Sequence, residues 1–352
     1  MKYIFRLFVF SISTGLILSS CSNDDDGTPQ VPLGDYENGY FILHEGAGPI
    51  TPVTYVGYDG TSEQAPFDNV NPGASPFGGF NQDLFFAGDL AFIISGQFAT
   101  VTVVNRYTLE FVASIDTDLE NPRYGTVLDG KAYVTNSGDF STTADDFVTI
   151  IDLSDYSTTT TLVGDIAERI EAINGKLYIT NGSFGSGNSL TVIDPNNLNA
   201  PSSIDFGDGN SPNSLEAGGG SLYVLTSSFT TTGKVFTINL SNDSISNTLD
   251  LPATLDAPRQ LDIEGNTIYF TNGTSVYGFT TGSSSISDTP ILTYQSSSQF
   301  GSMYGFSVRD NTIYIADAGD FVSNGTAFEY DLDGNLLNTI TTDVAPNSFH
   351  FN

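Results

Sequence analysis

The feature that most constrains the fold is a short motif that recurs along the whole body of the chain. In the motif a turn is followed by a Gly, Asp or Asn, an apolar residue, an aromatic residue, further apolar residues and, in most copies, Thr and Asn. Clear copies read GKAYVTN from residue 130, GKLYITN from residue 175 and NTIYFTN from residue 266. With the central aromatic residue as the marker, the copies fall at Phe41, Phe92, Tyr133, Tyr178, Tyr223, Tyr269 and Tyr314. The markers are 51, 41, 45, 45, 46 and 45 residues apart, so the chain contains seven units.

Each unit predicts four short antiparallel strands. One strand, such as residues 258–263, leads through a tight turn into the marker strand. After a loop come two further strands joined by a short turn, such as residues 190–193 and a strand that ends near Ile204. Four such strands in a repeat of about 45 residues are typical of a β-propeller blade. The sequence therefore predicts an all-β fold, a seven-bladed β-propeller of four-stranded antiparallel blades.

The C-terminal residues predict how the ring closes. Residues 346–351 read PNSFHF and match PNSLEA at 212–217, which forms the inner strand of its unit. No marker strand follows the C-terminal copy, whereas the first marker, Phe41, has no inner strand before it. We therefore expect the C-terminal strand to pair into the first blade, which removes the exposed edges of an open array.

The composition limits the functions that this fold could serve. The hydrophobic share of 39% is sufficient for a packed core despite a formal net charge of -31. Only 10 Lys and Arg stand against 41 Asp and Glu, which argues against nucleic acid as a partner and against a basic membrane-binding helix. One Cys and two His cannot supply an internal disulfide or an ordinary zinc site.

The N-terminus is typical of an exported, lipid-anchored protein. Residues 1–20 carry Lys2 and Arg6, an apolar stretch and then small residues, which is the layout of a signal peptide. The run Leu18-Ser19-Ser20-Cys21 resembles a bacterial lipobox, in which the Cys is lipidated. Residues 21–37 form an acidic, polar tether, and residues 38–352 form the predicted propeller. Acyl chains on Cys21 would hold the protein at a membrane without a spanning segment. The alternative for the acidic run after Cys21 is a solvated periplasmic spacer.

The Tyr-apolar-Thr-Asn strands and this leader resemble the YncE-type seven-bladed propellers, and specifically the surface lipoproteins of Bacteroidetes. The resemblance covers residues 38–352. That family includes proteins that capture cobalamin and pass the corrinoid to an outer-membrane TonB-dependent transporter. The resemblance implies an outer-membrane lipoprotein exposed at the cell surface. It specifies the ligand less well, because propellers share one architecture across many functions.

The candidate binding residues lie where the inner strands begin, on the face that carries the longer loops. Ten residues before each marker are Gln82, Arg123, Glu168, Asn213, Arg259 and Tyr304, with Asn347 from the closing strand. The following rank includes Tyr124, Arg169 and Gln260. Guanidinium groups suit carboxylate, phosphate or amide oxygens, and a Tyr offers an apolar face with a hydroxyl. The residues predicted to contact a ligand are Gln82, Arg123, Tyr124, Arg169, Arg259, Gln260, Tyr304 and Asn347. Alternatively, the arginines pair with Glu120, Glu168 or Asp262 and tie blades together.

A phenylalanine recurs on the same face, six or seven residues after the marker. It occupies Phe98, Phe140, Phe184, Phe229 and Phe321. Five such side chains could form an apolar collar for a large flat ligand. Alternatively, each one tucks between neighbouring blades.

The sequence gives little support for catalysis. His44 and His350 are expected on adjacent strands, four residues apart along the ladder, which is about 13 Å and too far to share a metal. Asp145-Asp146 and the run at Asp331 could flank a sugar bond or bind calcium, but they suit loop and turn chemistry better. We therefore expect a non-enzymatic binding protein without a cofactor or metal, whose ligand is, by resemblance, a corrinoid. A protein-interaction or adhesion module is the main alternative, and a carbohydrate-active or lactonase-like propeller is a weaker one.

Overall fold

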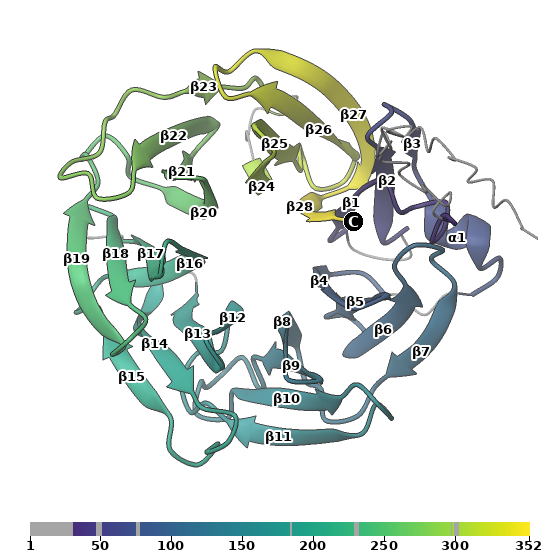
Figure 1. Ribbon diagram of the computed structural model, residues 1–352, viewed down its shortest axis with the longest axis horizontal. Coiled ribbons are helices and arrows are strands. Elements are labelled where there is room, and N and C mark those ends of the chain that lie inside the picture. Colours follow the sequence, from purple (N-terminus) through teal and green to yellow (C-terminus); the bar gives the residue numbers. More distant parts are fainter. Residues whose placement is uncertain are drawn as a thin grey trace, which may run out of the picture. The chain divides into compact units, whose positions relative to one another are not determined.

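The described strands of the computed structural model form seven four-stranded antiparallel sheets arranged in a ring (Figure 1). The model describes residues 31–46, 51–74, 78–183, 185–228, 232–296, 298 and 303–352. The chain divides into two units, Met1–Pro32 and Leu33–Asn352, and all seven sheets belong to the second unit. The prediction of a seven-bladed propeller is confirmed.

The blades follow the repeats, and in each of them the strands are named from the innermost to the outermost. Blade 1 contains β28 (Pro346–Phe351), β1 (Gly39–His44), β2 (Val53–Gly57) and β3 (Ser62–Glu63). Blade 2 contains β4 (Asn81–Ala87), β5 (Leu90–Ser95), β6 (Thr100–Asn105) and β7 (Phe111–Ile115). Blade 3 contains β8 (Pro122–Leu128), β9 (Lys131–Asn136), β10 (Phe147–Asp152) and β11 (Thr158–Leu162).

The remaining blades have the same order. Blade 4 contains β12 (Ile170–Ile173), β13 (Lys176–Ser183), β14 (Ser186–Ile193) and β15 (Ser202–Asp205). Blade 5 contains β16 (Ser211–Gly218), β17 (Ser221–Ser227), β18 (Lys234–Asn239) and β19 (Ser244–Asp250). Blade 6 contains β20 (Pro258–Glu264), β21 (Thr267–Asn272), β22 (Ser275–Thr280) and β23 (Leu292–Thr293). Blade 7 contains β24 (Met303–Arg309), β25 (Thr312–Asp317), β26 (Asn324–Asp331) and β27 (Leu336–Val344).

The hydrophobic core lies between the blades rather than within them. The aromatic markers are all buried, and each packs with apolar residues of a neighbouring blade. Tyr133 of blade 3, for example, packs with Leu177 and Ile179 of blade 4. Both faces of a blade are therefore covered, which explains why the marker strands are apolar at successive positions.

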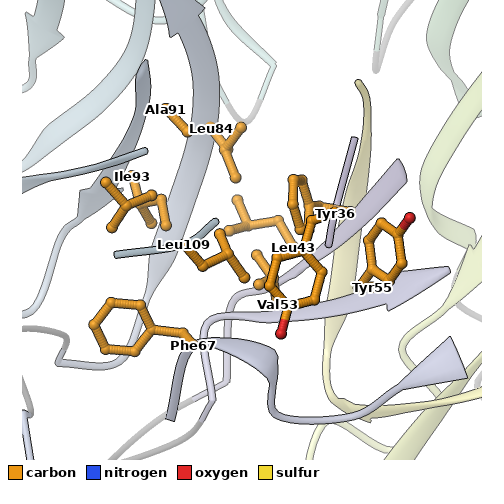
Figure 2. Packing of buried hydrophobic residues seen from close by; sticks show 11 residues of the cluster. Tyr36, Leu43, Val53, Tyr55, Phe67, Leu84, Ala91, Ile93 and Leu109 are labelled. Carbon is orange, nitrogen blue, oxygen red and sulfur yellow. The ribbon is translucent and has the colours of Figure 1, made fainter. Parts of the chain in front are cut away.

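Blades 1 and 2 enclose a cluster that also takes in the short helix α1 (Pro66–Val70). Figure 2 shows Phe67 of α1 beside Leu109, with Leu43 and Val53 of blade 1 in the same cluster. The first repeat, 51 residues long, is longer than the others, and it contains this helix, which covers the edge of the core. None of the helices in the described part of the chain has the length and hydrophobicity needed to cross a bilayer.

The C-terminal strand closes the ring, as predicted. In β28, Phe349 pairs with Ile42 and Phe351 pairs with Tyr40 of β1. The last residue, Asn352, fixes this closure, because its side-chain amide donates to the Arg106 carbonyl oxygen at 3.0 Å and its Oδ1 accepts from Arg106 Nε at 2.7 Å. The same amide donates to the carbonyl oxygen of Tyr36, so both ends of the propeller domain meet at one place.

Candidate functional site

A β-bulge at the start of the inner strand places the predicted binding residues at the mouth of the ring. The pairing register shifts at Gln82, at Arg123 and Tyr124, and at Asn213, Gln260, Tyr304 and Asn347. In blade 4 the bulge is seen in the main-chain bonds of Thr180. Its carbonyl accepts the Glu168 amide, and its amide donates to the Arg169 carbonyl, so one residue faces two. Since a bulge sets two residues opposite one, it aims two consecutive side chains away from the regular ladder. These are the two ranks that counting back from the markers selects.

The Thr and Asn of the repeat motif support these bulges. Thr135 Oγ1 accepts a hydrogen bond from the Tyr124 amide, and Thr180 Oγ1 accepts one from the Arg169 amide, each at 3.0 Å. Asn136 Oδ1 accepts the Glu120 amide at 2.9 Å, which holds the crossover from blade 2 into β8, the inner strand of the same blade as Asn136. The motif therefore satisfies main-chain donors that the bulge removes from the sheet.

Arg123 and Glu168 form an ion pair between blades 3 and 4. Arg123 Nε and one of its terminal nitrogens donate to the two Glu168 carboxylate oxygens at 3.1 and 3.2 Å. The exposed fractions of the two side chains are 22% and 11%. Ser183 Oγ adds a third hydrogen bond to Glu168 at 2.8 Å. Arg123 is therefore a link between blades, as the alternative interpretation of the arginines expects.

Arg169 is also held inside the protein. Its Nε donates to the Asn213 carbonyl of blade 5 at 3.0 Å, and its guanidinium carbon lies 4.7 Å from the centre of the Tyr124 ring. Tyr124 itself packs against the cluster between blades 3 and 4. The predicted stacking surface of Tyr124 is thus already covered on one face by a cation of the protein.

Polar side chains continue this pattern around the mouth. Gln260 Nε2 donates to the Tyr304 carbonyl at 2.7 Å, and Asn347 Nδ2 donates to the Asn81 carbonyl at 2.9 Å. Asn213 Nδ2 donates to the Pro258 carbonyl at 2.9 Å. Each of these bonds joins one blade to the next, so the mouth is a rigid, hydrogen-bonded ring.

Glu45 is a residue of the mouth that the repeat arithmetic did not select. It follows β1 directly, its carboxylate accepts a hydrogen bond from the Tyr304 hydroxyl, and it also bonds to the Gln82 side chain. Burial raises the pKa of Glu45, while these bonds and the charge of Arg123 oppose the increase. Its signal in the sequence was the first repeat copy, which ends in His-Glu where other copies carry Thr-Asn.

Arg259 is the predicted arginine that stays available at the mouth. The residue is exposed, and within the described part of the chain its side chain makes no hydrogen bond or ion pair. Of the three arginines that the sequence analysis places at the mouth, Arg123 and Arg169 make contacts between blades, and Arg259 is exposed.

Exposed phenylalanines lie on the loop-rich face in blades 2, 3 and 7. The exposed fractions of Phe98, Phe140 and Phe321 are 53%, 76% and 44%. The interpretation that these side chains tuck between blades is therefore wrong for these three. Phe321 still makes an edge-on contact with Tyr304 at 5.0 Å between ring centres. Phe184 and Phe229 lie outside the described residues.

Carboxyl groups line the inner strands of three consecutive blades below the mouth. Glu171, Glu216 and Asp262 each pair directly with the marker tyrosine of their own blade. Burial raises the pKa of Glu171 to about 8 and that of Glu216 well above its ordinary value, and the neighbouring carboxylates add to both increases. Asp262 is bonded by Ser307 Oγ and the Val308 amide of blade 7, both at 2.7 Å.

This cluster predicts a pH-dependent stability. Because the folded state raises the pKa of Glu171 and Glu216, both keep protons that the unfolded chain releases, and the free energy of unfolding falls as the pH rises above about 4.5. For Glu171 this decline ends near pH 8. His44 and His350 act in the opposite sense at lower pH, because burial lowers their pKa values to about 4 and about 3. The double variant Glu171→Gln, Glu216→Gln separates the two effects. We expect it to melt higher than the wild type at pH 8.5 and to lose most of that advantage at pH 5.

A matched exposed carboxylate provides the control. Glu110→Gln, in the turn before β7, should shift the unfolding midpoint equally little at both pH values. If the double variant and Glu110→Gln respond alike to pH, the raised pKa values of the inner-strand carboxyls are wrong.

The histidines follow their predicted register. His44 lies opposite Pro346, and His350 pairs with Phe41, four residues along β28. His44 is buried between Thr51 and Thr54, to which its ring nitrogens bond at 3.1 Å. In the described ranges, three or more His, Cys, Asp or Glu side chains do not come together in an arrangement that could hold a metal ion.

Comparisons with known proteins agree with this architecture. A family model described as "Domain of unknown function (DUF5074)" matches residues 38–324. No curated protein matches the chain. Among solved structures, a quinonprotein alcohol dehydrogenase-like protein from Bacteroides thetaiotaomicron has a TM-score of 0.70 at 15% identity, over 90% of this chain and 78% of that one.

Two further solved structures have the same fold. A functionally unknown protein from Desulfotomaculum acetoxidans gives a TM-score of 0.63 at 11% identity, over 90% of this chain and 100% of that one. Hydrazine synthase from Kuenenia stuttgartiensis gives 0.60 at 17% identity, over 74% of this chain and 86% of that one. At these identities the likeness establishes the propeller fold only.

Proposed function

The chain belongs to the DUF5074 family, and we propose that it is a non-enzymatic capture protein that binds a ligand on the loop-rich face of its propeller. The observation that supports the proposal is the set of exposed phenylalanines in three blades of the loop-rich face. Phe98, Phe140 and Phe321 come from blades 2, 3 and 7, and a soluble protein rarely leaves such side chains exposed on one rim without a use for them.

The rigidity of the mouth supports this role. Hydrogen bonds between successive blades fix the bulged residues before any ligand arrives, so little conformational entropy is lost on binding. Arg259 offers a free guanidinium beside this ring, which suits a carboxylate, phosphate or amide oxygen. A ligand with a broad apolar body and a few such oxygens matches the combination.

The place where the chain enters the domain also supports the proposal. The Tyr36 amide donates to the Tyr107 carbonyl in the turn between β6 and β7, and Asn352 bonds to Tyr36. The β6–β7 turn lies on the turn face, opposite the mouth. Cys21 lies outside the described residues. We propose that it is lipidated at the outer membrane, and Tyr36, where the chain enters the propeller, is bonded on the turn face and not at the mouth.

A corrinoid is the ligand that we propose, to be passed to a TonB-dependent outer-membrane transporter. It has a large flat body with amide and phosphate oxygens, which suits exposed phenylalanines beside the free guanidinium of Arg259. We expect calorimetry with cyanocobalamin to detect binding, and Arg259→Ala to weaken it about 10-fold or more, as the loss of a charge-assisted hydrogen bond predicts.

The matched control is Arg309→Ala. Arg309 is also exposed, with 52% of its side chain accessible, but it stands in the turn face beside Asp310. The capture proposal requires that this variant binds like the wild type. Equal losses in both variants would mean that the arginines act only through the net charge of the protein.

A protein-interaction or adhesion role is the second candidate. Arg123, Arg169, Gln260 and Tyr304 are bonded within the protein, so the face offers fewer free polar groups than a small-molecule pocket would need. This favours the second candidate. Absence of heat with several corrinoids would favour this candidate. Substituting Phe140, the most exposed of the three rim phenylalanines, by Ser should then abolish binding to the partner without changing the melting temperature.

A further inference from the structure

The loop between β9 and β10 contains two carboxylate oxygens that are buried without a partner. They are Oδ1 of Asp145 and Oδ1 of Asp146, and neither has a hydrogen-bond partner among the described residues. Asp146 is 2% exposed, so bulk water does not reach its side chain. An unpaired buried carboxylate oxygen is costly, and such an atom in a native protein usually marks an ion or a water.

The second oxygen of each carboxylate is held by a main-chain amide. Asp146 Oδ2 accepts the Ala167 amide of the next blade at 3.0 Å, and Asp145 Oδ2 accepts the Asp139 amide at 3.2 Å. Gly138 adopts a φ of +49°, and a Cβ there would lie 3.2 Å from Asp145 Oδ1. The loop thus closes tightly around Asp145, and only one oxygen of each carboxylate is left without a donor.

The charges around this point attract a cation. Burial raises the pKa of Asp146 to about 6, and the charges of Asp145, Glu168 and Asp165 add to the increase. The Glu168 charge is compensated by Arg123, whereas among the described residues neither Asp145 nor Asp146 has an ion-pair partner. Hard oxygen ligands of this kind suit Ca²⁺ or Mg²⁺ and do not suit zinc or other soft metals.

We propose that Asp145 and Asp146 bind a Ca²⁺ ion in the loop between β9 and β10, with main-chain carbonyls of that loop and water as the remaining ligands. Two carboxylates are fewer than the three-residue clusters that mark most metal sites, but Ca²⁺ takes six to eight oxygens and accepts carbonyls and water readily. Ca²⁺ is favoured over Mg²⁺ because it tolerates irregular geometry, whereas Mg²⁺ requires a near-ideal octahedron.

The site has a consequence for the loop-rich face. Phe140, which is 76% exposed, lies in the same loop between Asp139 and Asp145. An ion at Asp145 and Asp146 would fix both the loop and its contact with Ala167 of blade 4. The calcium proposal and its test do not require the proposed ligand, because both concern the conformation and stability of this loop.

Thermal unfolding of the full chain after treatment with EDTA tests the proposal. Addition of about 10 mM CaCl₂ should raise the midpoint by roughly 4 °C if the site has the sub-millimolar affinity of extracellular calcium modules. The same concentration of MgCl₂ should have a clearly smaller effect. Titration calorimetry with CaCl₂ should give one site per chain.

Two variants separate a built site from general charge screening, which matters in a chain of net charge -31. Asp145→Asn should lose the Ca²⁺-dependent shift and still melt cooperatively in EDTA. Asp155→Asn, at an exposed aspartate in the β10–β11 turn, should keep the shift. The proposal is wrong if Ca²⁺ gives no shift in the wild type, if Mg²⁺ gives an equal one, or if the two variants respond alike.

Discussion

Removal of residues 345–352 is expected to destabilise the protein more than any substitution at the mouth of the ring. The deletion removes β28, and with it the inner strand of blade 1 and the main-chain bonds that join it to β1. It also removes Phe349, which is 8% exposed in the cluster between blades 7 and 1. The lost burial and hydrogen bonds amount to roughly 5–10 kcal/mol, which is comparable to the whole stability of a domain. We expect the unfolding midpoint to fall by more than about 10 °C, or the truncated chain not to fold.

A milder variant shows whether the strand or its final contact is responsible. Asn352→Ala leaves β28 in place and removes only the side-chain bonds to Tyr36 and Arg106. It should cost about 1–3 kcal/mol, well below the effect of the deletion. A truncated protein that melts within a few degrees of the full chain would contradict closure of the ring by β28.

The fold could be predicted because its information is local and repeated. Each marker, such as Tyr178 or Tyr269, recurs with a turn before it and a polar residue after it, and a period near 45 residues leaves few architectures. The closing strand was predictable for the same reason, since residues 346–351 match the inner strand at 212–217 but have no marker strand after them. The helix α1 was not predicted, because it occurs once and is only five residues long.

The positions of the mouth residues could be predicted, but their partners could not. Counting from the markers selects Arg123 and Arg169, and both stand at the start of an inner strand where the regular pairing is interrupted. Whether an arginine faces solvent or the next blade depends on the residue that the next blade presents. Glu168 pairs with Arg123, whereas Arg259 forms no ion pair in the described part of the chain. That difference is tertiary and has no counterpart within one repeat.

The same limit applies to the phenylalanines and to Glu45. A loop phenylalanine looks alike in sequence whether it packs between blades or stays exposed, and only the folded loop decides for Phe98, Phe140 and Phe321. Glu45 belongs to the most degenerate repeat, and the contact that it makes with Tyr304 joins residues 259 positions apart. Contacts of that range arise from closure of the ring and not from the repeat itself.

The second large effect is expected at the ion pair between blades 3 and 4. Arg123→Ala leaves Glu168 with an exposed fraction of 11% and with Ser183 as its remaining side-chain donor. Breaking a fully buried pair from one side costs about 3–5 kcal/mol, and the partial exposure of this pair reduces the expected loss to about 2–3 kcal/mol. The loss arises mainly from the charge left on Glu168, so removal of both charges, as in Arg123→Met with Glu168→Met, should restore most of the stability.

Arg259→Ala is the matched control. Arg259 stands ten residues before its marker, as Arg123 does, but it is exposed. It should change the free energy of unfolding by less than about 0.5 kcal/mol in urea denaturation. This contrast tests the division of the arginines into one free for ligand and two that join blades. If Arg123→Ala is as neutral as Arg259→Ala, the ion pair does not hold the blades together, and Arg123 belongs with Arg259 among the groups available to a ligand.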